Sequence, residues 1–69
     1  MYQVYFEVVK FAEFETERQV RSLANLENAR YMALNLSSCA DIYGTVDVVD
    51  ALTGEVVAIY KCGKAYDPE

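Results

Sequence analysis

The chain has 69 residues, a formal net charge of −5 and a hydrophobic fraction of 54%. A chain this short forms one domain with a small core, and its surplus of apolar residues favours association. The acidic balance argues against direct binding of nucleic acid or of an anionic membrane, because both need a basic face on the protein. It is compatible with a protein partner that has a basic surface.

The chemistry-bearing residues are sparse. There is no histidine, and no spacing of cysteines or carboxylates matches a metal site or a calcium loop. A serine or cysteine nucleophile would lack its usual base. The sequence therefore predicts that the protein is not an enzyme, with no catalytic residue, no metal and no cofactor.

The first predicted strand covers residues 2–10, where hydropathy alternates with a period of two. One face would carry apolar residues, and the other would be mixed. The first set is Tyr2, Val4, Phe6 and Val8, and the second is Gln3, Tyr5, Glu7 and Val9.

The stretch from Phe14 to Leu23 has two interpretations, a polar second strand or a separate helical turn. Alternation of Thr16, Arg18 and Val20 with charged or amide residues favours the strand. A single long helix over 13–39 is disfavoured, because its early apolar residues would lie opposite the later apolar stripe.

The predicted helix begins near Leu26 and ends near Ser37 or Ser38. Asn25 has the character of an N-cap, and Glu27 favours the positive end of the helix dipole. An apolar stripe with helical spacing would face the sheet. It consists of Leu26, Ala29, Met32, Ala33, Leu36 and Cys39.

A β-hairpin is predicted over 43–62, closed by a four-residue loop at 51–54 in which Gly54 takes a positive φ. The predicted register places Val49 opposite Val56 and Val46 opposite Ile59. The helix-facing residues would be Val46, Val48, Val57 and Ile59, and the outward-facing ones Thr45, Asp47, Val49, Val56, Ala58 and Tyr60.

These elements predict one α+β domain over 1–62 and a C-terminal tail over 63–69. The sheet would be small and antiparallel, with three to four strands in the chain order β-(β)-α-β-β and one helix packed on one face.

The outer sheet face would then expose apolar and tyrosine side chains, which predicts an interface and a two-fold homodimer. Tyr31 and Leu34 would add an accessible site on the helix. The candidate interface residues are Tyr5, Val9, Val49, Val56, Ala58, Tyr60, Tyr31 and Leu34.

A candidate acidic contact is formed by Glu13, Glu15 and Glu17. On a strand these carboxylates would lie about 6–7 Å apart, close to the phosphate spacing of one DNA strand. A solvated surface is the alternative. Cys39 and Cys62 do not form a CxxC motif, and the first residues lack the pattern of a signal peptide, which predicts reduced thiols and a cytoplasmic protein.

The run from Asn25 to Leu36, followed by a strand and the segment Asp50–Val57 with its TGEVV motif, resembles short proteins of bacterial and phage genomes. In size, charge and style the chain is similar to anti-CRISPR proteins. The resemblance implies a phage or mobile-element inhibitor that blocks a basic nucleic-acid-binding surface of a host protein. The alternatives are a structural or regulatory homodimer and a small-ligand binding module with a tyrosine-lined pocket.

Overall fold

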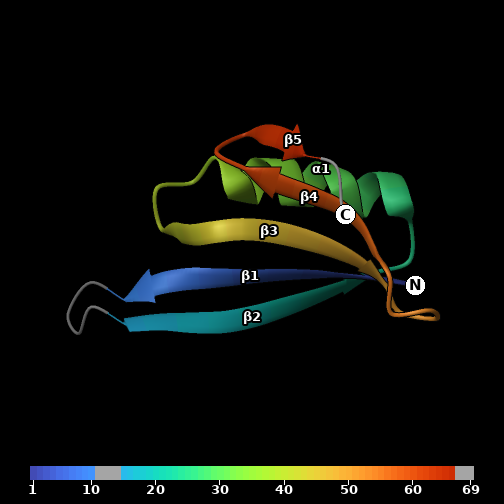
Figure 1. Ribbon diagram of the computed structural model, residues 1–69. Helices are drawn as coiled ribbons and strands as arrows, with labels where there is room; N and C mark the ends of the chain where they lie inside the picture. The colour runs from blue at the N-terminus through green and yellow to red at the C-terminus, as the bar shows by residue number, and fades with distance from the viewer. Residues whose placement is uncertain (11–14, 67–69) are drawn as a thin grey trace.

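The computed structural model describes residues 1–10 and 15–66, which form one antiparallel sheet and one helix (Figure 1). The sheet has five strands in the spatial order β2-β1-β3-β4-β5. Along the chain the elements are β1 (Tyr2–Lys10), β2 (Glu15–Leu23), α1 (Leu26–Ser37), β3 (Ile42–Asp50), β4 (Val56–Lys61) and β5 (Lys64–Tyr66).

The prediction of three or four strands is wrong, because β5 adds a strand within the segment 63–69 that was expected to be a tail. The fold is α+β but mostly sheet. A two-residue turn joins β4 to β5, with Cys62 at φ 52° and Gly63 at φ 77°. Such turns usually contain Asn-Gly or Asp-Gly, so Cys-Gly gave no recognisable turn signal.

The strand interpretation of the second segment is confirmed for Glu15–Leu23, whereas Phe14 lies outside the described residues. β1 and β2 pair without interruption from Tyr2–Leu23 to Lys10–Glu15. β2 lies at the edge of the sheet, and its side chains are exposed except at Gln19 and Leu23, which are half-buried. An edge strand with so little burial can be polar throughout.

The predicted helix is confirmed, and its start has a clear cause. The Asn25 side chain accepts hydrogen bonds from the backbone N–H groups of Glu27 (2.8 Å) and Asn28 (3.2 Å). Of the predicted stripe, Ala29 and Ala33 are fully buried, whereas Cys39 is an exposed free thiol. Small residues at these buried positions let the helix backbone approach the sheet closely.

The core lies between α1 and one face of the sheet. Its buried apolar residues come from β1, α1, β3 and β4, which places the helix across the middle of the sheet. They are Val4, Phe6, Ala29, Ala33, Val46, Val48, Ala58 and Tyr60.

The predicted register of the β3–β4 hairpin is correct only near its turn. Val49 pairs with Val56, but a β-bulge follows, and Val46 pairs with Tyr60 rather than with Ile59. Because side chains alternate between faces, a shift of one residue reverses which side chains are buried. Ala58 and Tyr60 therefore face the helix, and the prediction that they point outward is wrong.

The end of α1 is tied to the β4–β5 turn by Ser37, a buried polar residue. Its hydroxyl donates to the Leu34 carbonyl (2.8 Å) and accepts from the Gly63 N–H (3.0 Å). Ser37→Ala removes this acceptor and leaves a partly buried N–H unpaired, so we expect the free energy of unfolding to fall by about 1–2 kcal/mol.

Urea denaturation of Ser37→Ala and Ser38→Ala tests this expectation. The exposed Ser38 hydroxyl donates only to the Asn35 carbonyl, so its loss should change stability by less than about 0.5 kcal/mol. Equal effects of the two substitutions would contradict a specific role for the Ser37–Gly63 contact.

Candidate functional site

A wide bulge in β3 opens the face of the sheet opposite α1, called the helix-free face below. Tyr5 pairs with Asp47 and Glu7 pairs with Tyr43, so one intervening residue of β1 lies opposite three intervening residues of β3. Gly44 lies inside this bulge with φ +73°, a backbone conformation that other residues rarely adopt. The extra backbone separates the side chains on either side and leaves a hollow between them.

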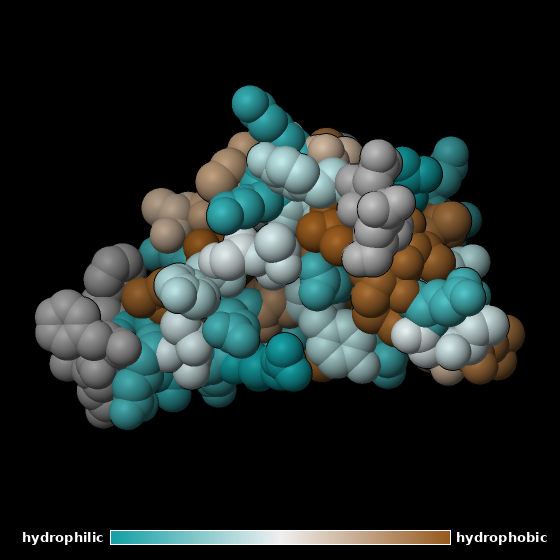
Figure 2. Space-filling view, in the orientation of Figure 1, coloured by the Kyte–Doolittle hydropathy of each residue, from teal (hydrophilic) through white to brown (hydrophobic). Residues whose placement is uncertain are grey.

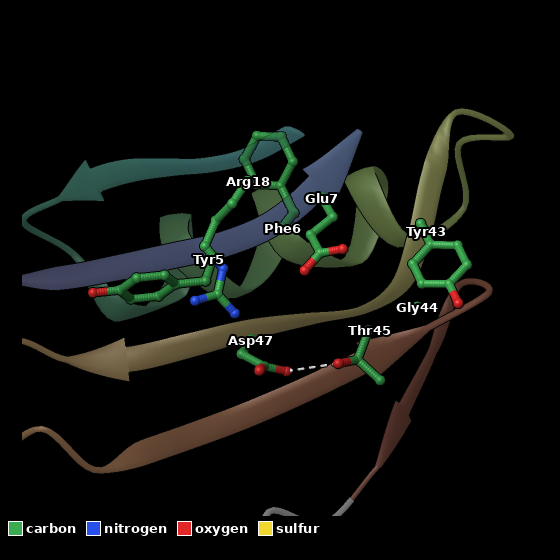
Figure 3. Close-up of a pocket in the computed structure, with 8 residues that line it drawn as sticks. All are labelled: Tyr5, Phe6, Glu7, Arg18, Tyr43, Gly44, Thr45 and Asp47. Carbon is green, nitrogen blue, oxygen red and sulfur yellow. Dashed lines mark hydrogen bonds between the residues drawn. The ribbon is translucent and has the colours of Figure 1, made fainter. Parts of the chain in front are cut away.

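This hollow has a volume of about 150 Å³ and is formed by three adjacent strands (Figure 3). Tyr5, Phe6 and Glu7 come from β1, Arg18 comes from β2, and the remaining walls come from the bulged part of β3. The full lining is Tyr5, Phe6, Glu7, Arg18, Tyr43, Gly44, Thr45 and Asp47.

The polar groups of the hollow leave it acidic, with two carboxylates and one guanidinium. The Thr45 hydroxyl donates to Asp47 Oδ1 (3.1 Å), and the Tyr5 hydroxyl donates to Gln3 Oε1 (2.8 Å), which fixes the direction of each side chain. Arg18 extends toward the Tyr5 ring (Figure 3). Among the described residues the only ion pair within 4 Å joins Lys10 to Glu17, so Arg18 does not directly neutralise the carboxylates of the hollow.

A second, shallower hollow of about 310 Å³ is formed by α1 together with Tyr60 of β4. Arg30 Nε donates to the Tyr60 hydroxyl at its floor (3.1 Å), and this hydrogen bond raises the pKa of Arg30. Tyr31 and Leu34 line it, and Tyr31 is largely exposed. Its charged members are Glu27 and Arg30, which balance one another.

The structure divides the predicted interface residues among separate places. Tyr5, Val9 and Val49 lie on the helix-free face, where each is half-buried. Tyr31 and Leu34 lie at the second hollow, on the other side of the molecule. Val56 is exposed at the start of β4 and pairs with Val49, so it shares the helix-free face. Ala58 and Tyr60 instead belong to the core. The eight residues therefore do not form one patch.

The two described glutamates of the predicted acidic contact lie among basic side chains. Glu15 and Glu17 are exposed and lie on the same face of β2, as the strand alternation requires, and Glu13 is outside the described residues. Glu17 is 3.9 Å from the Lys10 ammonium. Two arginines follow on the same strand, so β2 carries both signs of charge rather than an acidic strip.

The sequence reasoning named Tyr5 as a site residue but missed the carboxylates and Tyr43 around it. Their convergence depends on the β3 bulge, which an isolated glycine within a strand pattern can indicate. Gly44 between Tyr43 and Thr45 was that signal. Without the bulge, Asp47 appears as one of many solvated carboxylates.

Gly44 gives a direct test of the bulge. A Cβ at this position would meet no atom within 4 Å, so Gly44→Ala should cost only the strain of a left-handed backbone, about 1–2 kcal/mol of unfolding free energy. Gly44→Asn should cost less, because asparagine tolerates this conformation better. Urea denaturation of both variants distinguishes backbone strain from a simple intolerance of side chains, which would penalise asparagine more than alanine.

Comparison of the chain with known proteins adds no functional assignment. In the described part of the chain, no group of three or more cysteine, aspartate and glutamate residues is placed to hold a metal ion. The single helix of that part is neither long nor apolar enough to span a membrane. No protein-family model, no curated protein and no solved structure matches the chain.

Proposed function

We propose that the protein is a non-enzymatic interaction protein that docks its helix-free face against a basic surface of another protein. A lysine or arginine of that partner enters the hollow beside Glu7 and Asp47. The observation that carries this proposal is the convergence of two carboxylates from neighbouring strands on one hollow whose walls include Tyr5 and Tyr43.

The chemistry of the hollow suits an extended cationic side chain. Carboxylates accept charge-assisted hydrogen bonds from an ammonium or guanidinium group, and tyrosine faces attract the same cations. Water and salt screen charge contacts less inside a partly enclosed hollow than on an open surface. The net charge of −5 would steer a basic partner toward the protein and make the association weaken as salt rises.

In its most specific form, the protein is an inhibitor that covers the nucleic-acid-binding surface of its partner. Such surfaces consist largely of arginine and lysine side chains that contact phosphates. A protein that receives those side chains would compete with the nucleic acid. The hollow beside the β3 bulge, at about 150 Å³, lies below the range of about 300–1,000 Å³ typical of small-ligand pockets and suits a single side chain better than a whole ligand. The second hollow, at about 310 Å³ and with Tyr31 and Tyr60 in its lining, reaches the lower end of that range, so the ligand-binding alternative would use that hollow.

A peptide titration tests the proposal without knowledge of the natural partner. Addition of an arginine–glycine repeat peptide to isotopically labelled protein should shift the NMR signals of Tyr5, Glu7, Tyr43 and Asp47 most strongly. A glutamate–glycine repeat peptide should not shift them. Glu7→Gln combined with Asp47→Asn should weaken peptide binding roughly five- to thirty-fold, because two lost charge contacts of about 0.5–1 kcal/mol each sum to about 1–2 kcal/mol.

The matched control changes the same number of charges elsewhere. Asp41→Asn combined with Glu55→Gln alters two exposed carboxylates that do not line the hollow. If this control weakens binding as much as the hollow variant does, the peptide responds to net charge alone and the hollow is not the docking site.

A further inference from the structure

β2 is an edge strand with few of the features that usually block strand addition. It is nine residues long, contains no proline and pairs with β1 without a bulge. The opposite edge of the sheet is formed by β5, which has only three residues. Natural proteins commonly protect their edges with short strands, bulges or proline, so β2 is the edge available for pairing. The remaining feature of β2 that opposes uncontrolled strand addition is its charged side chains, which are Glu15, Glu17, Arg18 and Arg21.

The direction of the backbone groups of β2 follows from the pairing of β1. The Val9 N–H donates to the Asp41 carbonyl (2.7 Å), so Val9 directs its backbone groups toward β3. Because these directions alternate along a strand, the residues of β1 on either side of Val9, and every second residue from them, direct their N–H and C=O groups toward β2. These are the even-numbered residues, and they pair with Glu17, Gln19 and Arg21.

The even-numbered residues of β2 must therefore direct their N–H and C=O groups outward. The side chains agree with this assignment, because Arg21 Nη1 donates to the Val20 carbonyl (3.2 Å), a group that faces away from β1. The free edge consists of the backbone groups of Thr16, Arg18, Val20 and Ser22.

Among the antiparallel registers centred on Arg18, Gln19 or Val20, one brings opposite charges of β2 together without a like-charge pair. With Gln19 on a two-fold axis, Glu17 lies opposite Arg21 of the second copy, and Arg21 lies opposite Glu17 of the second copy. Arg18 lies opposite a valine. A shift that centres the pairing on Arg18 places Glu15 opposite Arg21, but it also opposes two arginines at the axis. A shift that centres the pairing on Val20 brings no opposite charges together.

We infer that β2 pairs antiparallel with β2 of a second copy about Gln19, so that one continuous sheet runs through both copies. In this register Arg18 and Val20 form hydrogen-bonded pairs through their outward backbone groups. Glu17 and Arg21 occupy the closer, non-hydrogen-bonded pairs, where cross-strand side chains interact most strongly. Arg21 exchanges its bond to the Val20 carbonyl for a carboxylate of the second copy.

The fold leaves room for this arrangement. β2 forms the edge of the sheet opposite to β4 and β5 and lies away from most of α1 (Figure 1). Hydrophilic residues lie along the lower edge of the space-filling view, where β2 runs (Figure 2). A strand-edge contact of this length is smaller than the interfaces of about 1,200–2,000 Å² that hold stable dimers. The dimer should therefore form reversibly with rising protein concentration.

A charge-swap experiment tests both the surface and the register. Sedimentation velocity from micromolar to millimolar concentration should show dimers of the wild-type protein. Glu17→Arg and Arg21→Glu should each weaken dimerisation at least about tenfold, because each creates two like-charge pairs across the axis. An equimolar mixture of the two variants should recover wild-type affinity as a heterodimer, since both pairs become opposite in charge.

Amide hydrogen exchange supplies an independent readout. The N–H groups of Arg18 and Val20 should exchange rapidly in dilute protein and become protected as concentration rises, whereas that of Gln19 should be protected throughout. A wild-type protein that stays monomeric at millimolar concentration would overturn the inference. So would a dimer unaffected by either charge reversal, because its contact would lie elsewhere. Peptide binding by the hollow is measured separately, so either proposal can fail alone.

Discussion

Replacement of Ala33 by aspartate is expected to unfold most of the protein at room temperature. Ala33 is fully inaccessible between α1 and the sheet, so the new carboxylate would be buried without a partner or would force the helix away. Either outcome should cost several kcal/mol. The total stability of a chain this long is about 3–10 kcal/mol, so a loss of this size removes most or all of it.

Far-UV circular dichroism and urea denaturation measure this effect, and Asn35→Asp is the matched control. Asn35 is on the same helix and exposed, so the same new charge there meets water. We expect the control to stay folded and to lose less than about 1 kcal/mol, mainly through the unfavourable position of a negative charge near the helix C-terminus. A folded Ala33→Asp protein with native stability would disprove the packing of α1 on the sheet.

The second large effect is expected for Phe6→Ala. Phe6 is 5% exposed and belongs to the core, so removal of its ring should lower the unfolding free energy by about 3–5 kcal/mol. Phe6→Leu retains most of the apolar volume and should cost less than about 1.5 kcal/mol. Urea midpoints of the two variants test this gradation.

Substitution of Arg21 measures how much of the stabilisation by the Phe6 ring comes from its contact with this arginine. Its guanidinium carbon lies 5.7 Å from the Phe6 ring centroid, a cation–π contact that contributes about 0.5–1 kcal/mol at an exposed site. Arg21→Ala should show this loss in the wild-type background and little in the Phe6→Ala background. Identical losses in both backgrounds would mean that the two side chains do not interact.

The helix and the first hairpin could be predicted because local patterns determine them. Asn25 caps α1 as its chemistry requires, and the alternation of β1 and β2 corresponds to their pairing. In α1 the N-cap and the apolar spacing indicate the same helix, and in β1 and β2 the alternating hydropathy indicates the strands that pair. Such agreement makes a local pattern a reliable guide.

The bulges could not be predicted in the same way, and they account for the wrong β4 register and for the hollow that was not predicted. The fifth strand was missed for a different reason, because the Cys62–Gly63 turn lacks the usual turn residues. The bulge between Val48 and Val49 reverses the faces of β4, so Tyr60 enters the core although the simple register points it outward. The bulge at Gly44 creates the hollow. A bulge is a difference of one or two residues between paired strands, and each single strand retains an ordinary alternating sequence.

The position of β1 in the sheet has a consequence for how the chain folds. β1 lies between β2 and β3, and Val4 pairs with Val48 across more than half of the sequence. The β1–β2 and β3–β4 hairpins can form locally, but their union must close a loop that contains α1. Chains dominated by such distant pairings fold in about milliseconds or longer, whereas helical bundles can fold in microseconds. Until that union forms, β1 and β3 each present an unpaired edge, so the β1–β3 junction is the step that makes the chain vulnerable to aggregation during synthesis.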